Sequence, residues 1–384
     1  MWRNLASNLF TLLIVALVVV AGLLAWAQRE YTGPGPLAEP ICFRVERGDT
    51  FRKVSDALVD QGAVSSGFIL RVGADYAGRT GDLKFGSYLL QPEASMEEIV
   101  EALTRSGQST CGTEVNFRIG VTDFDVILRE LDPATNRYVE IVSFDPEAEA
   151  VPDAYVQVAE RPDLRFRVTV AEGTTVWQVV EGLKRAEFLT GTVEELPPEG
   201  SLAPDSYELR RGDDRIAVIA EMRARQERIL AAAWADRDDD VPYATPEQAL
   251  IMASLIEKET GVAEERGLIA GVFVNRLKQG MRLQTDPAVI YGVTRGQGVL
   301  GRGLRQSELR GETPWNTYVI DGLPPTPIAN PGRESIRAAL SPDETDYLFF
   351  VADGTGGHAF AETLREHNEN VAQWRRIEAE RESD

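Results

Sequence analysis

The chain has 384 residues, of which 43% are hydrophobic and 26% are charged. This length leaves room for two or three domains, and the hydrophobic content excludes a chain that is disordered throughout. The formal net charge of −21 argues against binding to nucleic acid or to anionic lipid headgroups through bulk electrostatic attraction. Two histidines and two cysteines are too few for a convincing zinc site, so we expect no metal and no cofactor.

The first predicted element is an apolar segment, Leu9–Ala27, that contains no charged residue. One bilayer crossing needs about 20 apolar residues, so residues 1–30 are predicted to form a cytoplasmic tip and a transmembrane anchor. Arg3 precedes the segment and Trp26 lies near its end, where an interfacial aromatic residue is common. A cleavable signal peptide with a site at Ala25–Ala27 is the alternative. The segment is longer than a usual signal core of about 7–15 residues, which favours a retained anchor.

Residues 31–41 are rich in proline and glycine and are predicted to form a tether. The only two cysteines of the sequence, Cys42 and Cys111, both follow the anchor. An even number of cysteines in an oxidising compartment makes a disulfide plausible, and this bond would join the two ends of the first module. Two unpaired thiols are the alternative, because sequence does not test the geometry of a disulfide.

Residues 42–108 carry a hydrophobic pattern that recurs in residues 166–243. In each copy a short strand leads through a glycine to a helix that begins at a threonine, and a tyrosine and a further helix follow. The matching positions are Phe43 and Phe166, Val45 and Val168, Gly48 and Gly173, Thr50 and Thr175, Val54 and Val179, Leu58 and Leu183, and Tyr88 and Tyr207. A strand–helix–helix–strand grouping of this size resembles a LysM-like module. The helix Arg215–Ala235 is predicted to connect the second copy to the last domain.

Residues 109–165 contain short β-rich runs that are separated by turn residues such as Asp132-Pro133. Three strands are predicted, at Val126–Leu128, Tyr138–Val142 and Ala154–Val158. We interpret this region as a β-rich insertion without assigned chemistry, either a spacer or a partner-binding face.

Residues 244–384 form the last predicted domain, which opens with a helix-start signal. Thr245 can cap this helix, and Pro246 suits its first position. Glu257 and Glu259 then fall in the last turn, where the negative end of the helix dipole raises the pKa of a carboxyl group. A carboxyl group kept protonated in this way can act as a general acid near neutral pH. The alternative is a solvated helix end, as most clusters of glutamate and lysine are.

The C-terminal third contains four sequence blocks in this order: ASLIEKETGVAEER, VFVNRLKQGMRLQTDPAVIYG, ETPWNTYVIDGLPPTPIANPG and YLFFVADGTGGHAF. On these blocks the sequence resembles the membrane-bound endolytic murein transglycosylase family (MltG, or YceG-like); the upstream region matches more loosely. The resemblance implies an α+β protein with an N-terminal transmembrane helix, LysM-like small α+β modules with a β-rich insertion, and a C-terminal α+β lytic transglycosylase catalytic domain. It also implies a single-pass anchor in the inner membrane, with the C-terminal domain in the periplasm.

In this family, a carboxylic acid protonates the oxygen that links N-acetylmuramic acid to N-acetylglucosamine. The carboxylate then takes the proton of the muramic acid 6-hydroxyl, which closes on C1 and leaves a 1,6-anhydro end. One carboxyl group does both jobs, whereas ordinary glycoside hydrolysis usually needs two. Glu259 is the predicted catalyst, because Glu259-Thr260 resembles the Glu-Ser/Thr pair of lytic transglycosylases, in which the hydroxyl residue steadies the acid. Glu257 is the second candidate.

The resemblance predicts that two groups of residues bind the glycan: a loop facing the glutamate and an aromatic platform with an amide. The loop residues are Gln284, Thr285 and Asp286, and the platform residues are Trp315, Asn316 and Tyr318. Asp286 before Pro287 is equally a helix-start signal, and Trp315 could equally lie in a core. His358 is predicted to be a structural loop residue, with a position that reaches the cleft as the alternative. Asn330 is predicted to cap a helix that begins at Pro331.

The implied partners are peptidoglycan glycan strands, the inner membrane and cell-wall synthases, with no nucleic acid. The expected reaction cleaves nascent strands and so terminates their polymerisation. Whether one or both LysM-like copies hold the glycan stays open, as does endolytic cleavage against cleavage at strand ends. A muramidase that pairs Glu257 or Glu259 with Asp286 to activate water is one alternative. A non-catalytic glycan-binding scaffold of the synthesis machinery is the other.

Overall fold

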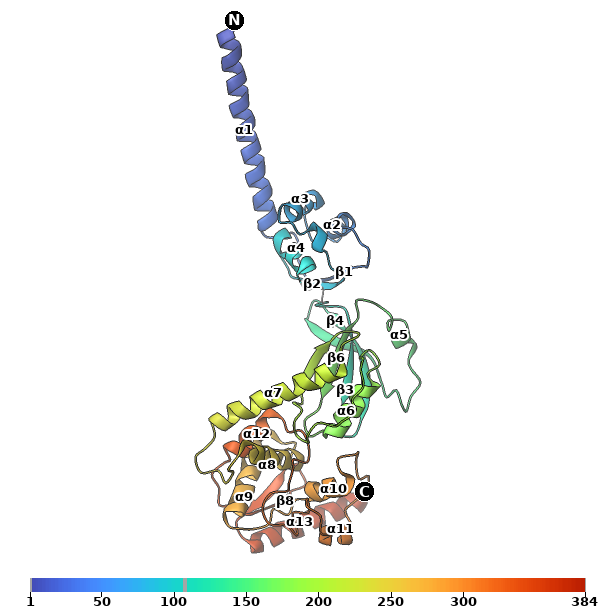
Figure 1. The fold of residues 1–384 in the computed structure, drawn as a ribbon, viewed down its shortest axis with the longest axis vertical. Coiled ribbons are helices and arrows are strands. Elements are labelled where there is room, and N and C mark those ends of the chain that lie inside the picture. Colours follow the sequence, from blue (N-terminus) through green and yellow to red (C-terminus); the bar gives the residue numbers. More distant parts are fainter. Residues whose placement is uncertain (1, 106–108, 384) are drawn as a thin grey trace. The chain divides into compact units, whose positions relative to one another are not determined.

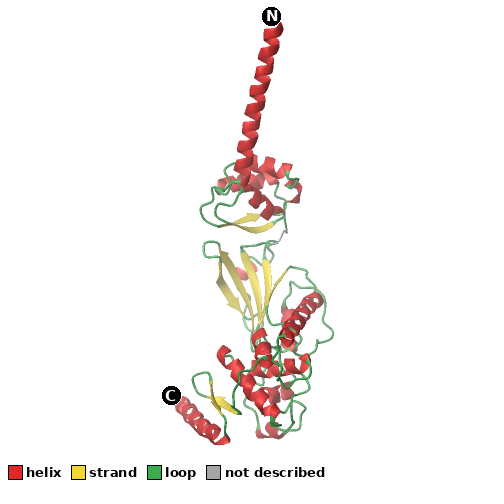
Figure 2. Ribbon diagram, turned by 90° about the vertical axis from the view of Figure 1, so that its left-hand side faces the viewer, coloured by secondary structure: helices red, strands yellow, loops and turns green. Residues whose placement is uncertain are grey.

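The computed structural model describes residues 2–105 and 109–383 and has a mixed α+β fold (Figures 1 and 2). The chain divides into two compact units. Unit 1 comprises Met1–Val115 and Ile127–Arg165, and unit 2 comprises Asn116–Val126 and Phe166–Asp384.

The N-terminal helix α1 spans Trp2–Thr32. Its segment Phe10–Thr32 is long and apolar enough to cross a membrane, with a mean hydropathy of 2.7, and it is not buried in the protein. Residues 31–41 do not form the predicted free tether. Leu37 lies in the core of the first module, and backbone hydrogen bonds join this segment to Glu93. The prediction of a tether rested on the proline and glycine content, which does not show that Leu37 is buried in the module.

The first module of unit 1 has a two-stranded antiparallel sheet covered by helices. Its elements are β1 (Ile41–Val45), α2 (Phe51–Asp60), α3 (Gly67–Tyr76), the 3₁₀ turn η1 (Thr80–Asp82), β2 (Gly86–Leu90) and α4 (Met96–Thr104). Phe43 faces Tyr88 across the sheet, and both side chains are buried. Cys42 and Cys111 form the predicted disulfide, with their Cα atoms 5.8 Å apart.

A second sheet has five strands in the order β5-β4-β3-β6-β7. Their bounds are β3 (Thr113–Ile119), β4 (Phe124–Asp132), β5 (Arg137–Phe144), β6 (Arg165–Val170) and β7 (Ser206–Leu209). The predicted strands around Val126–Leu128 and Tyr138–Val142 are confirmed. The predicted strand Ala154–Val158 is wrong, because helix α5 (Asp153–Val156) begins there after Pro152, and proline favours the start of a helix. Since β3 lies beside β6 in the sheet order, the β-rich region shares one sheet with the strands of the second copy of the repeat.

The second copy of the repeat contains β6, α6 (Val176–Arg185), β7 and α7 (Arg215–Ala235). As in the first copy, the two strands are antiparallel and a threonine side chain caps the helix. The two tyrosines also match: Tyr88 donates to the carbonyl of Lys84 and Tyr207 to the carbonyl of Ala203, four residues earlier in each case. Between β6 and β7, a fully described stretch, α6 is the only helix. The order strand–helix–helix–strand is therefore present in the first copy alone.

The C-terminal part of unit 2 surrounds one buried helix, α8 (Pro246–Glu259). The other elements are η2 (Ala263–Glu265), α9 (Arg266–Lys278), α10 (Asp286–Thr294), α11 (Gln306–Arg310), α12 (Arg333–Leu340), β8 (Phe349–Ala352), β9 (His358–Ala361) and α13 (Leu364–Ser383). Helices α7, α9, α10 and α12 all contact α8. Thr245 caps α8 and Pro246 opens it, as predicted. Because α8 is packed on several sides, the position of its last residue, Glu259, is firmly held.

Candidate active site

Glu259 lies at the C-terminal end of α8, where the chain leaves the helix in an extended conformation at Thr260. Its carboxyl oxygen Oε1 is enclosed and has no hydrogen-bond partner among the described residues. Burial raises the pKa of this carboxyl group to about 7, and the negative charge of Asp286 acts in the same direction. Near neutral pH a substantial fraction of Glu259 is therefore protonated.

Three groups act in the opposite direction and lower the pKa of Glu259: the hydroxyl of Thr285 and the charges of His358 and Arg276. The Thr285 hydroxyl lies near the carboxyl group but does not complete a hydrogen bond to it. Within the described chain, Thr285 Oγ1 has no hydrogen-bond partner, as is also the case for Glu259 Oε1. These groups stabilise the carboxylate once the proton has left. Near pH 7 the protonated and the ionised forms of Glu259 therefore have similar free energies. This suits a group that donates a proton and takes one back.

Thr285 and Asp286 are brought to Glu259 by the start of α10. The Thr285 backbone N–H donates to Thr317 Oγ1 at 2.9 Å, and this hydroxyl donates to the Thr285 carbonyl at 3.2 Å. Asp286 is exposed, and its Oδ1 accepts a hydrogen bond of 2.7 Å from the Tyr318 hydroxyl. Helix α10 begins at Asp286-Pro287, which confirms the predicted helix-start signal, and the N-cap position belongs to Thr285, whose side chain makes no capping bond.

Arg276, on α9, was not among the predicted site residues. Its guanidinium donates to the carbonyls of Leu348 and Leu283, at 2.6 Å each, and the side chain is buried. It lies three residues after Phe273, on the apolar face of its helix. An arginine at an apolar position is the signal that could have revealed it.

The side chain of Thr260 turns to Glu265 rather than to Glu259. Its hydroxyl donates to Glu265 Oε2 at 3.2 Å and accepts from the Val262 N–H at 2.9 Å. Glu265 also accepts from the His358 backbone N–H at 2.7 Å and pairs with His358 Nδ1 at 2.8 Å. The expected support of the acid by Thr260 is therefore absent from these contacts. His358 lies at the first position of β9 and not in the loop, it is paired with Glu265, and its charge also acts on Glu259.

Glu257 has different surroundings, although it lies in the same helical turn. Its Oε2 accepts the backbone N–H of Gly332 at 2.9 Å, and Gly332 is the N-cap residue of α12. Its charge also helps to raise the pKa of Glu172, after the larger effect of burial. Residues two apart on an α-helix point about 200° away from each other. Glu257 is thus directed to the start of α12, and the groups that act on Glu259 do not include it.

Of the predicted glycan-binding residues, Asn316 serves the fold instead and Trp315 is partly covered. Asn316 is fully buried, its amide nitrogen donates to the carbonyls of Glu308, Leu309 and Gly311, and its Oδ1 accepts from the Tyr318 N–H. Direct glycan binding by Asn316 is therefore a wrong prediction, because every polar group of its side chain is already used. Trp315 is half-buried, donates to Thr326 Oγ1 at 3.0 Å, and has the Arg295 guanidinium 4.1 Å from its ring centroid. One face of the predicted platform is thus covered.

Gln284 and Asn330 complete the predicted residues. Gln284 is exposed, has a positive φ of 51°, and donates its backbone N–H to Thr317 O at 3.1 Å. Within the part of the chain that the structure describes, its exposed side chain shows no hydrogen bond, so it can meet a ligand. Asn330 does not cap α12; its amide donates to Thr174 O at 3.0 Å and its Oδ1 accepts from the Leu202 N–H at 3.0 Å. Its role is to tie the loop before α12 to the second copy of the repeat.

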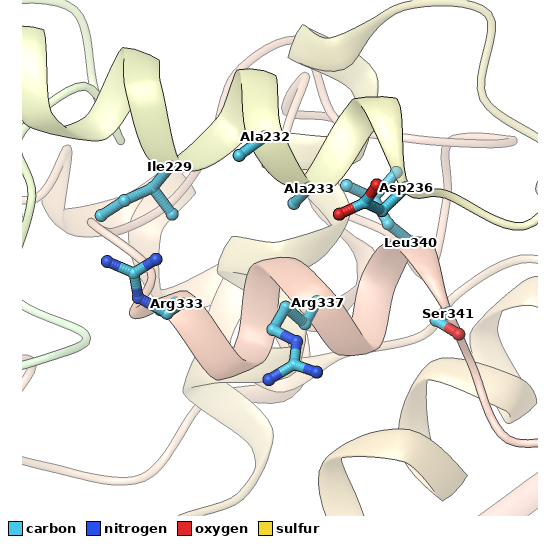
Figure 3. A pocket seen from close by; sticks show the side chains of 8 residues that line it. All are labelled: Ile229, Ala232, Ala233, Asp236, Arg333, Arg337, Leu340 and Ser341. Atoms are coloured by element: carbon cyan, nitrogen blue, oxygen red, sulfur yellow. The ribbon is translucent and has the colours of Figure 1, made fainter.

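A cavity of about 390 Å³ lies apart from these residues, between α7 and α12 (Figure 3). Its lining residues are Ile229, Ala232, Ala233, Asp236, Arg333, Arg337, Leu340 and Ser341. Neither Glu259 nor any group that acts on it borders this cavity. The acid site is therefore defined by the enclosed carboxyl group and not by the cavity.

The fold and the site define a mixed α+β protein in which burial raises the pKa of an enclosed carboxylic acid, Glu259, to about 7. Within the described residues no group of three or more His, Cys, Asp or Glu side chains is arranged to hold a metal ion. The family model of the YceG-like family matches residues 43–136 and 135–373, so the chain belongs to the YceG-like family.

Two curated relatives are named endolytic murein transglycosylase. The Bacillus subtilis (strain 168) protein is 38% identical over 172 residues, which is 45% of this chain and 46% of the relative. The Streptococcus pneumoniae serotype 2 (strain D39) protein is 27% identical over 341 residues, which is 86% of this chain and 57% of the relative. The chain thus spans about half the length of these relatives. A crystal structure of a yceG-like protein from Listeria monocytogenes aligns with a TM-score of 0.45 and 24% identity, covering 86% of this chain and 99% of that one.

Proposed function

We propose that the chain is a lytic transglycosylase that cleaves the β-1,4 bond between N-acetylmuramic acid and N-acetylglucosamine in peptidoglycan, within the strand. The observation that carries this proposal is Glu259: one enclosed carboxyl group whose pKa is raised by burial to about 7. The names of the relatives in the family agree with this activity.

In the proposed reaction, protonated Glu259 donates its proton to the glycosidic oxygen as the bond from C1 to that oxygen breaks. The resulting carboxylate then removes the proton of the muramic acid 6-hydroxyl while that oxygen bonds to C1. The acid is regenerated and no water is consumed. Arg276 and Thr285 favour the carboxylate between the two transfers, since both lower the pKa of Glu259. The exposed, negatively charged Asp286 suits the stabilisation of positive charge that develops at the sugar ring.

A muramidase is the second candidate, and Asp286 is the observation that favours it. Its carboxylate is exposed and close enough to Glu259 to raise the pKa of that group, so it could activate a water molecule. The hydrogen bond from Tyr318 to Asp286 Oδ1 counts against this role, because it withdraws electron density from the base.

Digestion of purified sacculi by the detergent-solubilised full chain, followed by mass spectrometry of the products, separates the candidates. We expect 1,6-anhydro ends, which are lighter than reducing ends by one water, and products from the interior of the strands. The variant Glu259→Gln should release them at least about 100-fold more slowly while binding sacculi normally. Reducing ends from the wild type would identify a hydrolase, and no release at all would identify a scaffold.

We also propose that α1 is retained as an inner-membrane anchor, with the chain that follows it in the periplasm, where the enzyme terminates nascent strands beside the synthases. The uncharged apolar segment of α1 and the preceding Arg3 support this orientation. The N-terminal sequence of the mature protein and protease access to a C-terminal tag in spheroplasts test it. Cleavage after Ala27 or a protected tag would contradict it.

We propose that the first LysM-like module binds the glycan strand and that the second copy is a structural support. In the first copy the turn at Gly48 is open, and Arg47 lies over Phe85 with 4.6 Å to the ring centroid. In the second copy the equivalent turn is covered: Lys258 Nζ donates to Gly173 O at 3.2 Å, and the Gly173 N–H donates to Asn330 O at 3.0 Å.

Pull-down with sacculi tests this assignment in the Glu259→Gln background, which holds the glycan uncut. Arg47→Ala with Phe85→Ala should weaken binding, because these residues are in the open copy. The matched control is Arg211→Ala, which removes a guanidinium that lies 5.1 Å from the Phe166 ring in the second copy. Equal losses from both sets would show that both copies hold the glycan.

A further inference from the structure

The end of α1 is fixed to the first module, and both belong to unit 1. The ring of Tyr31 lies directly on the backbone of Gly73 in α3, so close that a Cβ added to Gly73 would be 2.2 Å from it. Glu30 accepts a hydrogen bond from Ser65, just before α3, and Leu37 is buried in the core of the module. The helices of this module lie at the end that α1 enters, and its strands lie at the opposite end (Figures 1 and 2). The orientation of the module relative to α1 is therefore fixed by these contacts.

Helix α3 presents an apolar stripe to solvent, formed by Phe68, Val72 and Tyr76, which follow each other at intervals of four residues. Their side chains are 69%, 52% and 95% exposed. The opposite face of the same helix is buried in the module core. Single exposed hydrophobic residues are normal on a protein surface, but three on one face of a short helix are typical of a contact surface.

The stripe lies at the level where the bilayer ends. From Ala27, the last residue of the apolar segment, to Tyr31 is about 6 Å of helix at 1.5 Å per residue. The headgroup layer on each side of the hydrocarbon core is roughly 5–7 Å thick. The contact of Tyr31 with Gly73 is therefore at headgroup level, and Val72 is the next residue along. Near the end of the apolar segment of α1, Leu23, Leu24 and Trp26 are also exposed.

The charges on α3 agree with contact with uncharged lipid. Within α3 the charged residues are Arg71 and Asp75. Arg71 pairs with Asp56 at 2.8 Å and also donates to Ser55. The face thus offers apolar side chains without an excess of either charge, and anionic lipid is not needed for its contact.

We propose that the stripe of Phe68, Val72 and Tyr76 lies in the interface of the bilayer that α1 spans. This proposal rests on the proposed membrane anchor. Amphipathic helices that lie in this plane bury their apolar face about 5–10 Å into the boundary between headgroups and acyl chains. With two attachments, α1 and α3, the first module has a fixed height and tilt above the membrane. The glycan that it is proposed to hold is then presented at a defined distance from the lipid surface.

The test uses the full chain in nanodiscs of phosphatidylcholine, with and without bromine atoms on the acyl chains, placed from near the headgroups to the middle of the bilayer. A fluorophore is attached to one introduced cysteine at a time: Phe68→Cys, Val18→Cys or Val139→Cys. The native cysteines do not interfere, because they are joined in a disulfide. Val18 lies in α1, and Val139 is an exposed control on β5 in the same unit.

We expect brominated lipid to quench the labels at positions 68 and 18 at least about twofold, because position 68 is proposed to lie about 5–10 Å deep and position 18 lies in the hydrocarbon core, and to leave position 139 unchanged. Val72→Asp should reduce quenching at position 68 and not at position 18, since it places a charge in the interface. Quenching at position 18 without quenching at position 68 would overturn the proposal and leave the anchor intact. Quenching at neither position would overturn both. Protection of position 68 from aqueous iodide that depends on the number of chains per disc, without bromine quenching, would mean that a second copy covers the stripe.

Discussion

Two regions at the end of α8 differ sharply, although the glutamates that define them are two residues apart. Glu257 is directed to the start of α12 and accepts a backbone hydrogen bond from Gly332. Glu259 is directed to a region built by α9, the start of α10 and β9, where its Oε1 finds no donor among the residues that the structure describes. The helix dipole acts on both glutamates, so it cannot explain the difference. The surroundings of each side chain decide which carboxyl group is suited to acid catalysis.

The largest expected effect is on the rate of cleavage. Glu259→Gln keeps the shape of the side chain but removes the proton donor, so the release of anhydro-ended products should fall by about 10²–10⁴-fold, the usual contribution of a general acid–base residue. Glu257→Gln should change the rate far less, because its amide oxygen can still accept from the Gly332 N–H. Equal losses in the two variants, measured on equal amounts of folded protein, would contradict the difference between the two regions.

The next effect is on stability, and it depends on pH. The pKa of Glu259 is raised to about 7 from an ordinary value of 4.5, so the native state binds this proton more tightly than the unfolded state. The free energy of unfolding should therefore fall as the pH rises from 4.5 to 7, by roughly 3 kcal/mol in all. Glu259→Gln has no such cost, so it should unfold at a higher temperature than wild type at pH 8 and at about the same temperature at pH 4.5. Calorimetry at both pH values checks this, and an equal difference at the two pH values would contradict it.

A smaller effect is expected from the other region. Glu257→Ala removes the acceptor of the Gly332 N–H at the start of α12, and losing a helix cap costs about 0.5–2 kcal/mol. Glu257→Gln should cost less, since it retains an acceptor. The control is Glu334→Ala on the same helix, because Glu334 is exposed and pairs only with the exposed Arg337 in the described chain. Thermal unfolding of the three variants measures the cost, and a Gln variant as unstable as the Ala variant would exclude the capping role.

The smallest effect concerns the pKa of the acid itself. Asp286→Asn removes a negative charge that raises the pKa of Glu259, so the alkaline limb of kcat/KM should move to lower pH, by less than about one pH unit. Tyr318→Phe is the matched control, because it removes the hydrogen bond to Asp286 Oδ1 and leaves the charge in place. The measurement is the pH profile on solubilised glycan strands. An unchanged alkaline limb in Asp286→Asn would show that Asp286 does not act on the acid.

Sequence patterns predicted the local structure around the acid well. The cap at Thr245, the proline at the start of α8 and the bounds of α7 are as expected, because helix-start signals and 3.6-residue periodicity act over a few neighbouring residues. The sequence blocks also led to Glu259 and to the correct family. The residue types in the loops were less informative. Asn316 and Asn330 have the side chains of sugar-binding or capping residues, but both are used up by backbone groups from other segments.

The sequence by itself determined which residue stands at the end of α8, which helices flank it, and which family the chain belongs to. Only the tertiary structure decided what surrounds that residue. Desolvation and charge act through space. Burial and Asp286 raise the pKa of Glu259, whereas Arg276 and His358 lower it, and these three charged residues come from three separate elements. A pKa near 7 is therefore a property of the packed domain, and no periodicity within one helix predicts it.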